Sequence, residues 1–377
     1  MDGELGYNER RILDLLRSEG PMSRVGLARA TGLTTPSLSR LTQSLTNNRL
    51  LLDLHKVRDG QRGKPAQLIK INPDGAFAMG IAVQSEYLSA CLIDLEGNLR
   101  ASVARNLAEA DPAVVASLSA KLLDQLLAES GVARRRVIGA GVCMPGVAIG
   151  TYGAGLQPGG QTYLPDEYEA WKELDIPAHF QHALHLPTWL ENSSKAATLA
   201  DLYFGAAQRM RNFAAIHIAY GFGGGLIFDR KPYHGTLGRS AEFGGLFPYE
   251  EARPSGRDLL AFLAARMKKP PQHIRDLARA TIPEPLITEW IARVGPSLVD
   301  LSRHLAILLD IEAIVLNGLL PTAVLAPMAQ MLRERLPHTI PTSLGTPEIV
   351  VSQLAKSGLD LGAASLPLHY VTSATSC

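Results

Sequence analysis

The chain has 377 residues, of which 46% are hydrophobic and 19% charged, and its formal net charge is +1. This is the composition of a globular protein with room for two or three domains, and no apolar run reaches the ~20 residues of a membrane span. Three cysteines, Cys91, Cys143 and Cys377, are widely spaced and form no CxxC pair, which argues against a cysteine-based zinc site and favours the reducing cytoplasm. We also find no basic-then-apolar pattern of a signal peptide at the amino terminus.

The charge is unevenly distributed along the chain. Residues 1–72 hold twelve Lys and Arg against seven Asp and Glu, which leaves 25 against 29 for the remainder. A basic amino-terminal part on a slightly acidic remainder predicts a polyanionic partner for the amino-terminal part alone.

Residues 8–47 predict three short helices. In residues 8–18 the isoleucine and the leucines form one apolar stripe, with Asn8 as a possible cap. Ser23 is a plausible N-cap for the second helix, Gly32 suits the turn that follows it, and Pro36 falls in the first turn of the third helix. The spacing of the small and apolar residues is that of a helix-turn-helix. We expect these residues to face inward: Val25, Leu27, Ala28, Leu38 and Leu41.

The outer face of the third helix predicts a DNA-reading surface. Its side chains are of the kinds that read a major groove or contact phosphates. An ordinary helical hairpin with a polar outer face is the alternative. The candidate DNA contacts on this helix are Thr34, Thr35, Ser37, Ser39, Arg40 and Gln43.

Residues 50–72 predict a β-hairpin, which behind a helix-turn-helix forms a wing. Leu50, Leu52 and Leu54 alternate, Asp59-Gly60 marks a turn, and an apolar return strand follows. The tip and return arm combine cations with Gly and Pro, a slim strip that can enter a minor groove. A solvated loop is the alternative. The candidate DNA contacts of the wing are Arg58, Arg62 and Lys64.

Residues 72–75, Asn-Pro-Asp-Gly, predict a turn and a domain boundary. Beyond them strands alternate with helices, which predicts an α/β fold with sheets covered on both sides. Strands are expected within residues 77–93, 99–107, 137–142, 213–228, 313–316 and 348–352, a strand followed by a helix in 189–204, and helices in 112–130, 259–309 and 359–370.

Several motifs in this order make the chain resemble the ROK family of repressors, open reading frames and sugar kinases, and more closely its xylose/N-acetylglucosamine repressor branch. The motifs are GVCMPG at 141–146, WLENSSKAATLADLYFG at 189–205, the glycine run at 221–225, HGTLGRSAEFGG at 234–245 and LGAASL at 361–366. The resemblance implies a winged helix-turn-helix over residues 1–72. It further implies a two-lobed actin-like ATPase (ribonuclease H-like) domain, with a first lobe over 77–200, completed by a helix in 355–377, and a second lobe over 201–354.

The chain departs from this family where its kinases bind ATP phosphates. Family kinases place an Asp and a Gly-Gly-Thr loop where this chain has Ala82, Gln84, Ser85 and Glu86. A carboxylate at the last of these positions would repel phosphate. In the second phosphate loop of the family, Tyr220 stands at the position of a threonine.

The sugar and zinc positions of the family are also changed. The Asp that serves family kinases as general base is Ser193, which follows Asn192, and serine has no useful basicity near neutral pH. Glu242, which in the family hydrogen-bonds sugar hydroxyls, is kept, whereas the zinc-binding His is Gly245 and residues 247–260 contain no Cys. We therefore expect no catalytic residues, no metal and no cofactor.

These observations predict a cytoplasmic transcriptional regulator, a repressor of carbohydrate genes, that binds duplex DNA as a homodimer or homotetramer. Its kinase-dead body would sense a sugar-like effector in a pocket between the lobes. A decayed pocket whose polar residues cap helices or bind water is the alternative for that site. The rival functions are an active sugar kinase with an accessory DNA-binding head and a DNA-binding protein without effector. The candidate effector contacts are Asn192, Ser193, Glu242, Gln157 and Asp258.

Overall fold

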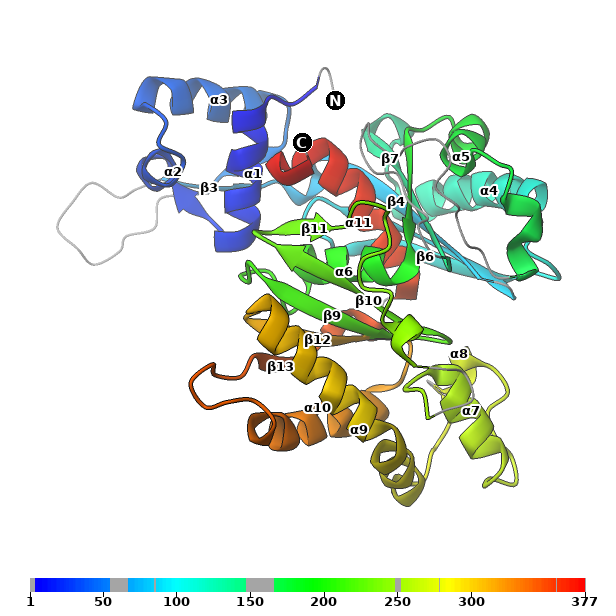
Figure 1. Ribbon diagram of the computed structural model, residues 1–377. Coiled ribbons are helices and arrows are strands. Elements are labelled where there is room, and N and C mark those ends of the chain that lie inside the picture. Colours follow the sequence, from blue (N-terminus) through cyan, green and yellow to red (C-terminus); the bar gives the residue numbers. More distant parts are fainter. Residues whose placement is uncertain are drawn as a thin grey trace. The chain divides into compact units, whose positions relative to one another are not determined.

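The computed structural model describes residues 4–54, 67–84, 86–146, 166–247, 252–277, 279–356 and 358–376. These residues fall into two compact units (Figure 1). Unit 1 contains Met1–Gly155, Thr162–Ser193 and Leu359–Cys377, and unit 2 contains Leu156–Gln161 and Ser194–Gly358. None of the helices in these ranges is long and apolar enough to cross a membrane.

Unit 1 begins with three helices and a three-stranded antiparallel sheet, together called the head below (blue in Figure 1). The Ser23 hydroxyl accepts a hydrogen bond of 3.0 Å from the Gly26 amide, and Gly32 adopts a left-handed φ of 69°, so the predicted cap and turn are confirmed. The strands pair antiparallel in the order β1-β3-β2. The elements are α1 (Tyr7–Glu19), β1 (Met22–Ser23), α2 (Arg24–Thr31), α3 (Thr35–Asn47), β2 (Leu51–Asp53) and β3 (Leu68–Ile71).

Two local predictions for the head are wrong. Val25 is 70% exposed, because it lies two residues, about 200° of helix rotation, from the buried Leu27. In the hairpin, the register pairs Leu51 with Ile71 and leaves Leu52 exposed on the other face. Gly6 rather than Asn8 caps α1, and its amide donates to the Glu9 carboxylate at 2.9 Å.

The body of unit 1 is a five-stranded sheet in the order β6-β5-β4-β7-β8. The first three strands are antiparallel neighbours, and β4, β7 and β8 are parallel. Phe77, Met79 and Ile81 of β4 share one apolar core with α4 and α5. The elements are β4 (Phe77–Val83), β5 (Tyr87–Asp94), β6 (Leu99–Asn106), α4 (Pro112–Ser130), β7 (Val137–Met144), α5 (Ile176–Leu184) and β8 (Thr188–Asn192).

Helix α11 (Gly358–Thr372) lies directly on the other face of this sheet. A Cβ atom on Gly80 of β4 would come within 1.9 Å of the Asp360 carbonyl oxygen, and one on Gly141 of β7 within 1.8 Å of the Ala363 carbonyl oxygen. Only glycine permits this approach of helix backbone to strand backbone.

Unit 2 repeats the strand pattern in the order β11-β10-β9-β12-β13, with antiparallel neighbours up to β9 and parallel ones after it. Helices α9 and α10 share an apolar core with one face of the sheet, and α7 and α8 complete that core. The elements are β9 (Phe213–Ile218), β10 (Phe222–Phe228), β11 (Lys231–Tyr233), α7 (Gly256–Ala264), α8 (Ile274–Leu277), α9 (Glu284–Leu309), β12 (Ala313–Gly318), α10 (Thr322–Arg335) and β13 (Glu348–Val351).

Helix α6 (Ser193–Phe204) covers the other face of this second sheet. A Cβ on Gly223 would lie 3.0 Å from the Ser194 hydroxyl, and one on Gly225 would lie 2.3 Å from the Thr198 hydroxyl. From the sequence we assign residues up to 200 to the first lobe. Because these glycines admit α6, the helix packs in unit 2 instead.

A buried polar network connects α6 to the sheet of unit 2. The Asn317 amide donates to the Asp201 carboxylate at 2.8 Å, so its oxygen must accept the 2.8 Å hydrogen bond from His217 Nδ1. Ser352 donates to the second Asp201 oxygen at 2.5 Å. His217 Nε2 is thereby left as a bare acceptor, and it has no partner within the described part of the chain.

Burial shifts both titratable groups of this network toward their neutral forms. It raises the pKa of Asp201 to about 6, against hydrogen bonds from Asn317 and Ser352 that lower it. It lowers the pKa of His217 to about 4. At neutral pH His217 is therefore an uncharged imidazole.

We expect His217→Asn to reduce the loss of stability in acid. The depressed pKa of His217 contributes stability that is present above pH ~6.5 and is lost as the pH falls toward 4, by about 3 kcal/mol in total. Asparagine can still donate to Asn317 and cannot be protonated. Thermal midpoints from pH 7 to pH 4 should therefore fall less in the variant. The raised pKa of Asp201 changes stability with pH in the opposite direction, but Asp201 is present in both proteins. Thermal midpoints of wild type and variant that fall in parallel would contradict the prediction.

Candidate functional site

The outer face of α3 is built by burial of its opposite face. Leu38, Thr42 and Leu45 are buried against the rest of the head, and Leu41 is half-buried. Of the predicted DNA contacts on this helix, Ser37 is half-buried and receives a 3.0 Å hydrogen bond from the Thr34 hydroxyl. The other five are exposed: Thr34, Thr35, Ser39, Arg40 and Gln43.

Arg40 differs from most arginines of the head in its lack of internal partners. Arg11 donates to the Thr31 carbonyl oxygen at 3.0 Å, and Arg24 forms a 3.0 Å ion pair with Asp53. Arg40 makes no hydrogen bond or ion pair with any residue that the structure describes. Its guanidinium is thus available to an external anion.

Exposed Arg29, in the last turn of α2, was missed by our sequence reading. The signal that could have revealed it is its place three residues before Gly32. A cation there lies next to the turn that leads into α3, and it could contact a phosphate beside the groove.

The predicted wing residues Arg58, Arg62 and Lys64 lie outside the described residues. The strands that lead to them are defined, and the hairpin is closed at that end by a 2.8 Å hydrogen bond from the Leu54 amide to the Leu68 carbonyl oxygen. The sequence interpretation of the wing tip stays a prediction.

The β4–β5 connection, where family kinases have their first phosphate loop, is a tight hairpin. The methyl group of Ala82 is fully buried, and the Gln84 amide donates to the Tyr87 carbonyl oxygen at 3.0 Å. Glu86 is exposed, and its carbonyl oxygen accepts from the Leu107 amide at 2.9 Å. Of the described residues in this connection, Gln84 uses its amide inside the hairpin and the carboxylate of Glu86 would repel phosphate.

The β9–β10 turn around Tyr220 is held by the first residues of α7. The amides of Gly256 and Arg257 donate to the carbonyl oxygens of Ala219 and Tyr220, at 2.7 and 3.0 Å. The Tyr220 side chain is 52% exposed. These two amides at the start of α7 are consequently used inside the protein rather than left for a phosphate.

In unit 1, the predicted effector contacts Asn192 and Ser193 end β8 and begin α6. The Asn192 amide group donates to the Gly146 carbonyl oxygen, and its backbone amide donates to the Glu191 carboxylate at 2.7 Å. Both side chains are buried, and the Ser193 hydroxyl has no hydrogen-bond partner among the residues described. Gln157, the third polar candidate, lies outside the described residues.

In unit 2, Glu242 forms an ion pair with Lys195, a residue our sequence reading did not select. The Lys195 ammonium group donates to the Glu242 carboxylate at 3.2 Å and to the Gly238 carbonyl oxygen at 3.0 Å. The Lys195 side chain is 5% exposed and that of Glu242 31%. The sequence feature that could have revealed this pair is a lysine in the first turn of a helix that otherwise buries small residues. A buried ammonium group needs a carboxylate partner.

The predicted effector contact Asp258 is engaged with helix α9. Its carboxylate accepts a 2.6 Å hydrogen bond from the Trp290 indole and forms an ion pair with Arg293. This gives Asp258 a structural role in unit 2. Its role in effector binding stays a prediction.

The residues around Gly245 do not fit a zinc ion. No group of three His, Cys, Asp or Glu side chains that could hold a metal occurs in the described ranges. The buried Arg253 guanidinium reaches to within 2.1 Å of where a Cβ on Gly244 would lie. A positive charge at this place disfavours a bound cation.

The chain can now be compared with known proteins. A model of the ROK family matches residues 78–369. The uncharacterized protein y4fQ of Sinorhizobium fredii (strain NBRC 101917 / NGR234) is 30% identical over 323 residues, which cover 84% of this chain and 79% of that protein. The xylose repressor of Bacillus subtilis (strain 168) is 24% identical over 237 residues, 63% of this chain and 59% of the repressor.

The fold has a solved counterpart over nearly its whole length. The crystal structure of a ROK family transcriptional regulator, a homolog of the E. coli MLC protein, has a TM-score of 0.72 and 19% sequence identity. The likeness covers 98% of this chain and 97% of that one, head included. The family model, which spans most of the chain, and this shared fold lead to one conclusion: the chain belongs to the ROK family.

Proposed function

We propose that this protein is a sequence-specific DNA-binding regulator that represses genes of carbohydrate metabolism. The observation that carries the proposal is the exposed polar face of α3 on a basic head, with Arg40 making no hydrogen bond or ion pair to the residues that the structure describes. Arginine on an exposed recognition helix reads guanine or contacts phosphate. The family relative from Bacillus subtilis is named a xylose repressor, which supports the same reading.

The body, in this proposal, senses a small molecule and does not transfer phosphate. Ser193 replaces the carboxylate base, and the hairpin at Gln84 and Glu86 replaces the phosphate loop. General-base catalysis contributes roughly 10²–10⁴-fold to the rate of such a reaction. Without a loop that binds the ATP phosphates, the transferred phosphoryl group would not be positioned. A sugar-like effector would be contacted by polar residues of the body, namely Asn192, Ser193, Glu242, Gln157 and Asp258.

Two copies would act together in the cytoplasm. A single head covers too little DNA for high specificity, so a homodimer or homotetramer would read an inverted repeat.

Arg40→Ala should weaken binding to a duplex selected in vitro by the wild-type chain. Loss of one bidentate base contact costs about 1–3 kcal/mol, or roughly 5- to 150-fold in affinity, and relaxes specificity at one position. Titration of labelled duplex at fixed salt measures the change. Arg335→Ala, at an exposed arginine of α10, is the matched control and should bind like wild type. Equal affinities of the Arg40 variant and wild type would place the interface elsewhere.

At least one member of a carbohydrate panel should raise the thermal midpoint of the protein. A ligand at 100 times its Kd stabilises the folded state by about 2.7 kcal/mol. Glu242→Gln should abolish the shift, whereas Glu289→Gln, which breaks the exposed pair with Arg266, should preserve it. If no carbohydrate shifts the midpoint, the sensor part of the proposal fails.

An assay of ADP release with ATP and common hexoses should give no turnover above a protein-free control. The rival function, an active sugar kinase with an accessory head, requires turnover. Ser193→Asp should also stay inactive, because Ala82, Glu86 and Tyr220 still leave the phosphates without a cradle. ATP-dependent phosphorylation by the wild-type chain would establish the rival.

A further inference from the structure

We propose that residues Thr372–Ala374, at the end of α11 and directly after it, are the joint through which the body positions the DNA-binding head, and that Asp14 is the positioning residue of this joint. The inference rests on the proposed DNA-binding function and specifies how it is regulated. It places the regulatory contact at the end of the chain rather than in the connection between head and body.

The joint is a buried set of hydrogen bonds between α1 and the end of the chain. The Asp14 carboxylate accepts from the Ser373 hydroxyl at 3.0 Å and from the Ala374 amide at 2.8 Å. Arg17 pairs with Asp14 at 3.2 Å and donates to the Thr372 hydroxyl at 2.9 Å. Thr372 and Ser373 are 0% and 1% exposed, and the side chains of Arg17 and Asp14 are 4% and 20% exposed. Because little water reaches these groups, loss of the Asp14 carboxylate removes one partner from the buried Arg17 guanidinium and from the Ser373 hydroxyl.

Helix α1 carries this contact to the DNA-reading helix. At its amino-terminal end, Glu9 accepts a 2.9 Å hydrogen bond from Ser44 of α3, and Arg11 donates to the Thr31 carbonyl oxygen at the end of α2. Ile12 and Leu16 lie between these points in the core of the head. A displacement of α1 therefore moves α2 and α3 with it, as one packed body.

Helix α11 carries the contact to the body. Its backbone rests on β4 and β7 at Gly80 and Gly141, without intervening side chains. The chain enters α11 directly from unit 2, which ends at Gly358. Movement of unit 2 thus acts on one end of α11, and the head is bound to the other end.

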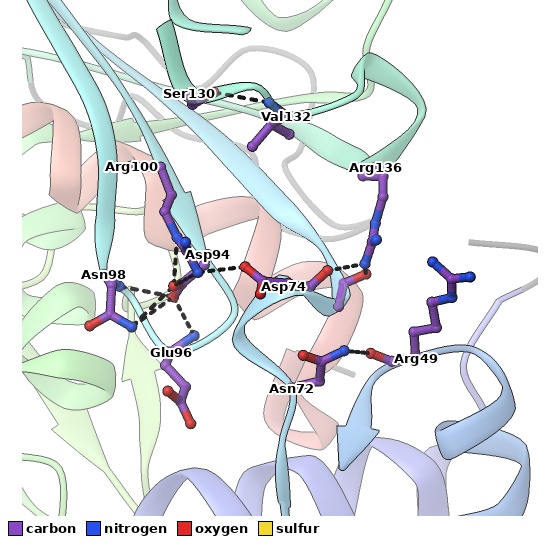
Figure 2. A network of polar contacts seen from close by, with 11 residues as sticks. Arg49, Asn72, Asp74, Asp94, Glu96, Asn98, Arg100, Ser130, Val132 and Arg136 are labelled. Atoms are coloured by element: carbon purple, nitrogen blue, oxygen red, sulfur yellow. Dashed lines mark hydrogen bonds and ion pairs between the residues drawn. The ribbon is translucent and has the colours of Figure 1, made fainter.

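The head has a second attachment, which serves as a pivot (Figure 2). The Asn72 side chain donates to the Arg49 carbonyl oxygen at 2.6 Å, and Arg136 donates to the carbonyl oxygens of Asp74 and Gly75. Arg100 bridges Asp74 and Asp94, at 2.6 and 2.7 Å. With the chain fixed here, a shift at Thr372–Ala374 turns the head about residues 72–75. In a two-fold dimer such a turn changes the spacing of the two α3 helices.

The test uses DNA as the probe, because coupling between two sites is reciprocal. Hydrogen exchange of the full-length protein is measured with and without a duplex selected in vitro. Binding to wild type should slow exchange in residues 365–374. In Asp14→Ala and in the milder Asp14→Asn, this DNA-dependent change should be lost, while Asp124→Asn, which breaks the exposed pair with Arg134, should retain it.

A second measurement requires no DNA. The Ala374 amide should exchange roughly tenfold faster or more in Asp14→Ala than in wild type, since its acceptor is removed. Exchange in α4 should be unchanged, which shows that the variant is folded.

Two results would overturn the inference: wild type that binds duplex without a change in residues 365–374, or Asp14 variants that keep the change. Failure of wild type to bind any duplex would instead refute the proposed function, and the two failures are thus distinguishable.

Discussion

Strand glycines that let a helix approach a sheet closely are the constraint on which both units depend. In unit 1 the glycines of β4 and β7 admit the backbone of α11, and in unit 2 the glycines of β10 admit the Ser194 and Thr198 side chains of α6. The two sheets share one strand pattern. Helix α6 begins where the chain passes from unit 1 into unit 2, and α11 begins where it passes back into unit 1. Any methyl group at Gly80 or Gly141 would collide with a carbonyl oxygen, so these positions accept nothing larger.

In the function proposed above, the ROK fold does not transfer phosphate. Serine stands where a base is needed, and a short acidic hairpin stands where a phosphate cradle is needed. In unit 2 a closed network of His217, Asn317 and Asp201 ties α6 to β9 and β12, with both titratable groups shifted toward neutrality. Polar residues of the body also bind one another, as Lys195 does Glu242.

Local signals made the fold predictable to a large extent. The cap at Ser23, the left-handed Gly32 and the helix over 112–130 depend on neighbouring residues, and the structure confirms them. The exposure of Leu52 depends on the hairpin register, which pairing with β3 sets and its own segment does not specify. The packing of α6 depends on glycines of β10 some 30 residues farther along the chain. The ion pair of Lys195 with Glu242 and the engagement of Asp258 by Trp290 join distant segments, so no spacing rule could find them.

The late position of α11 has a consequence for how the protein is made. Apart from Leu156–Gln161, unit 2 is one continuous stretch, Ser194–Gly358, so most of it can fold as soon as it leaves the ribosome. The sheet of unit 1 is synthesised earlier but lacks its cover, with the strands at Gly80 and Gly141 open to water, until α11 emerges. The contact of the head with the residues after α11 forms at the same stage, because Ser373 and Ala374, two hydrogen-bond partners of Asp14, lie there. A nascent chain interrupted before α11 would therefore carry a folded second unit and an incomplete first one.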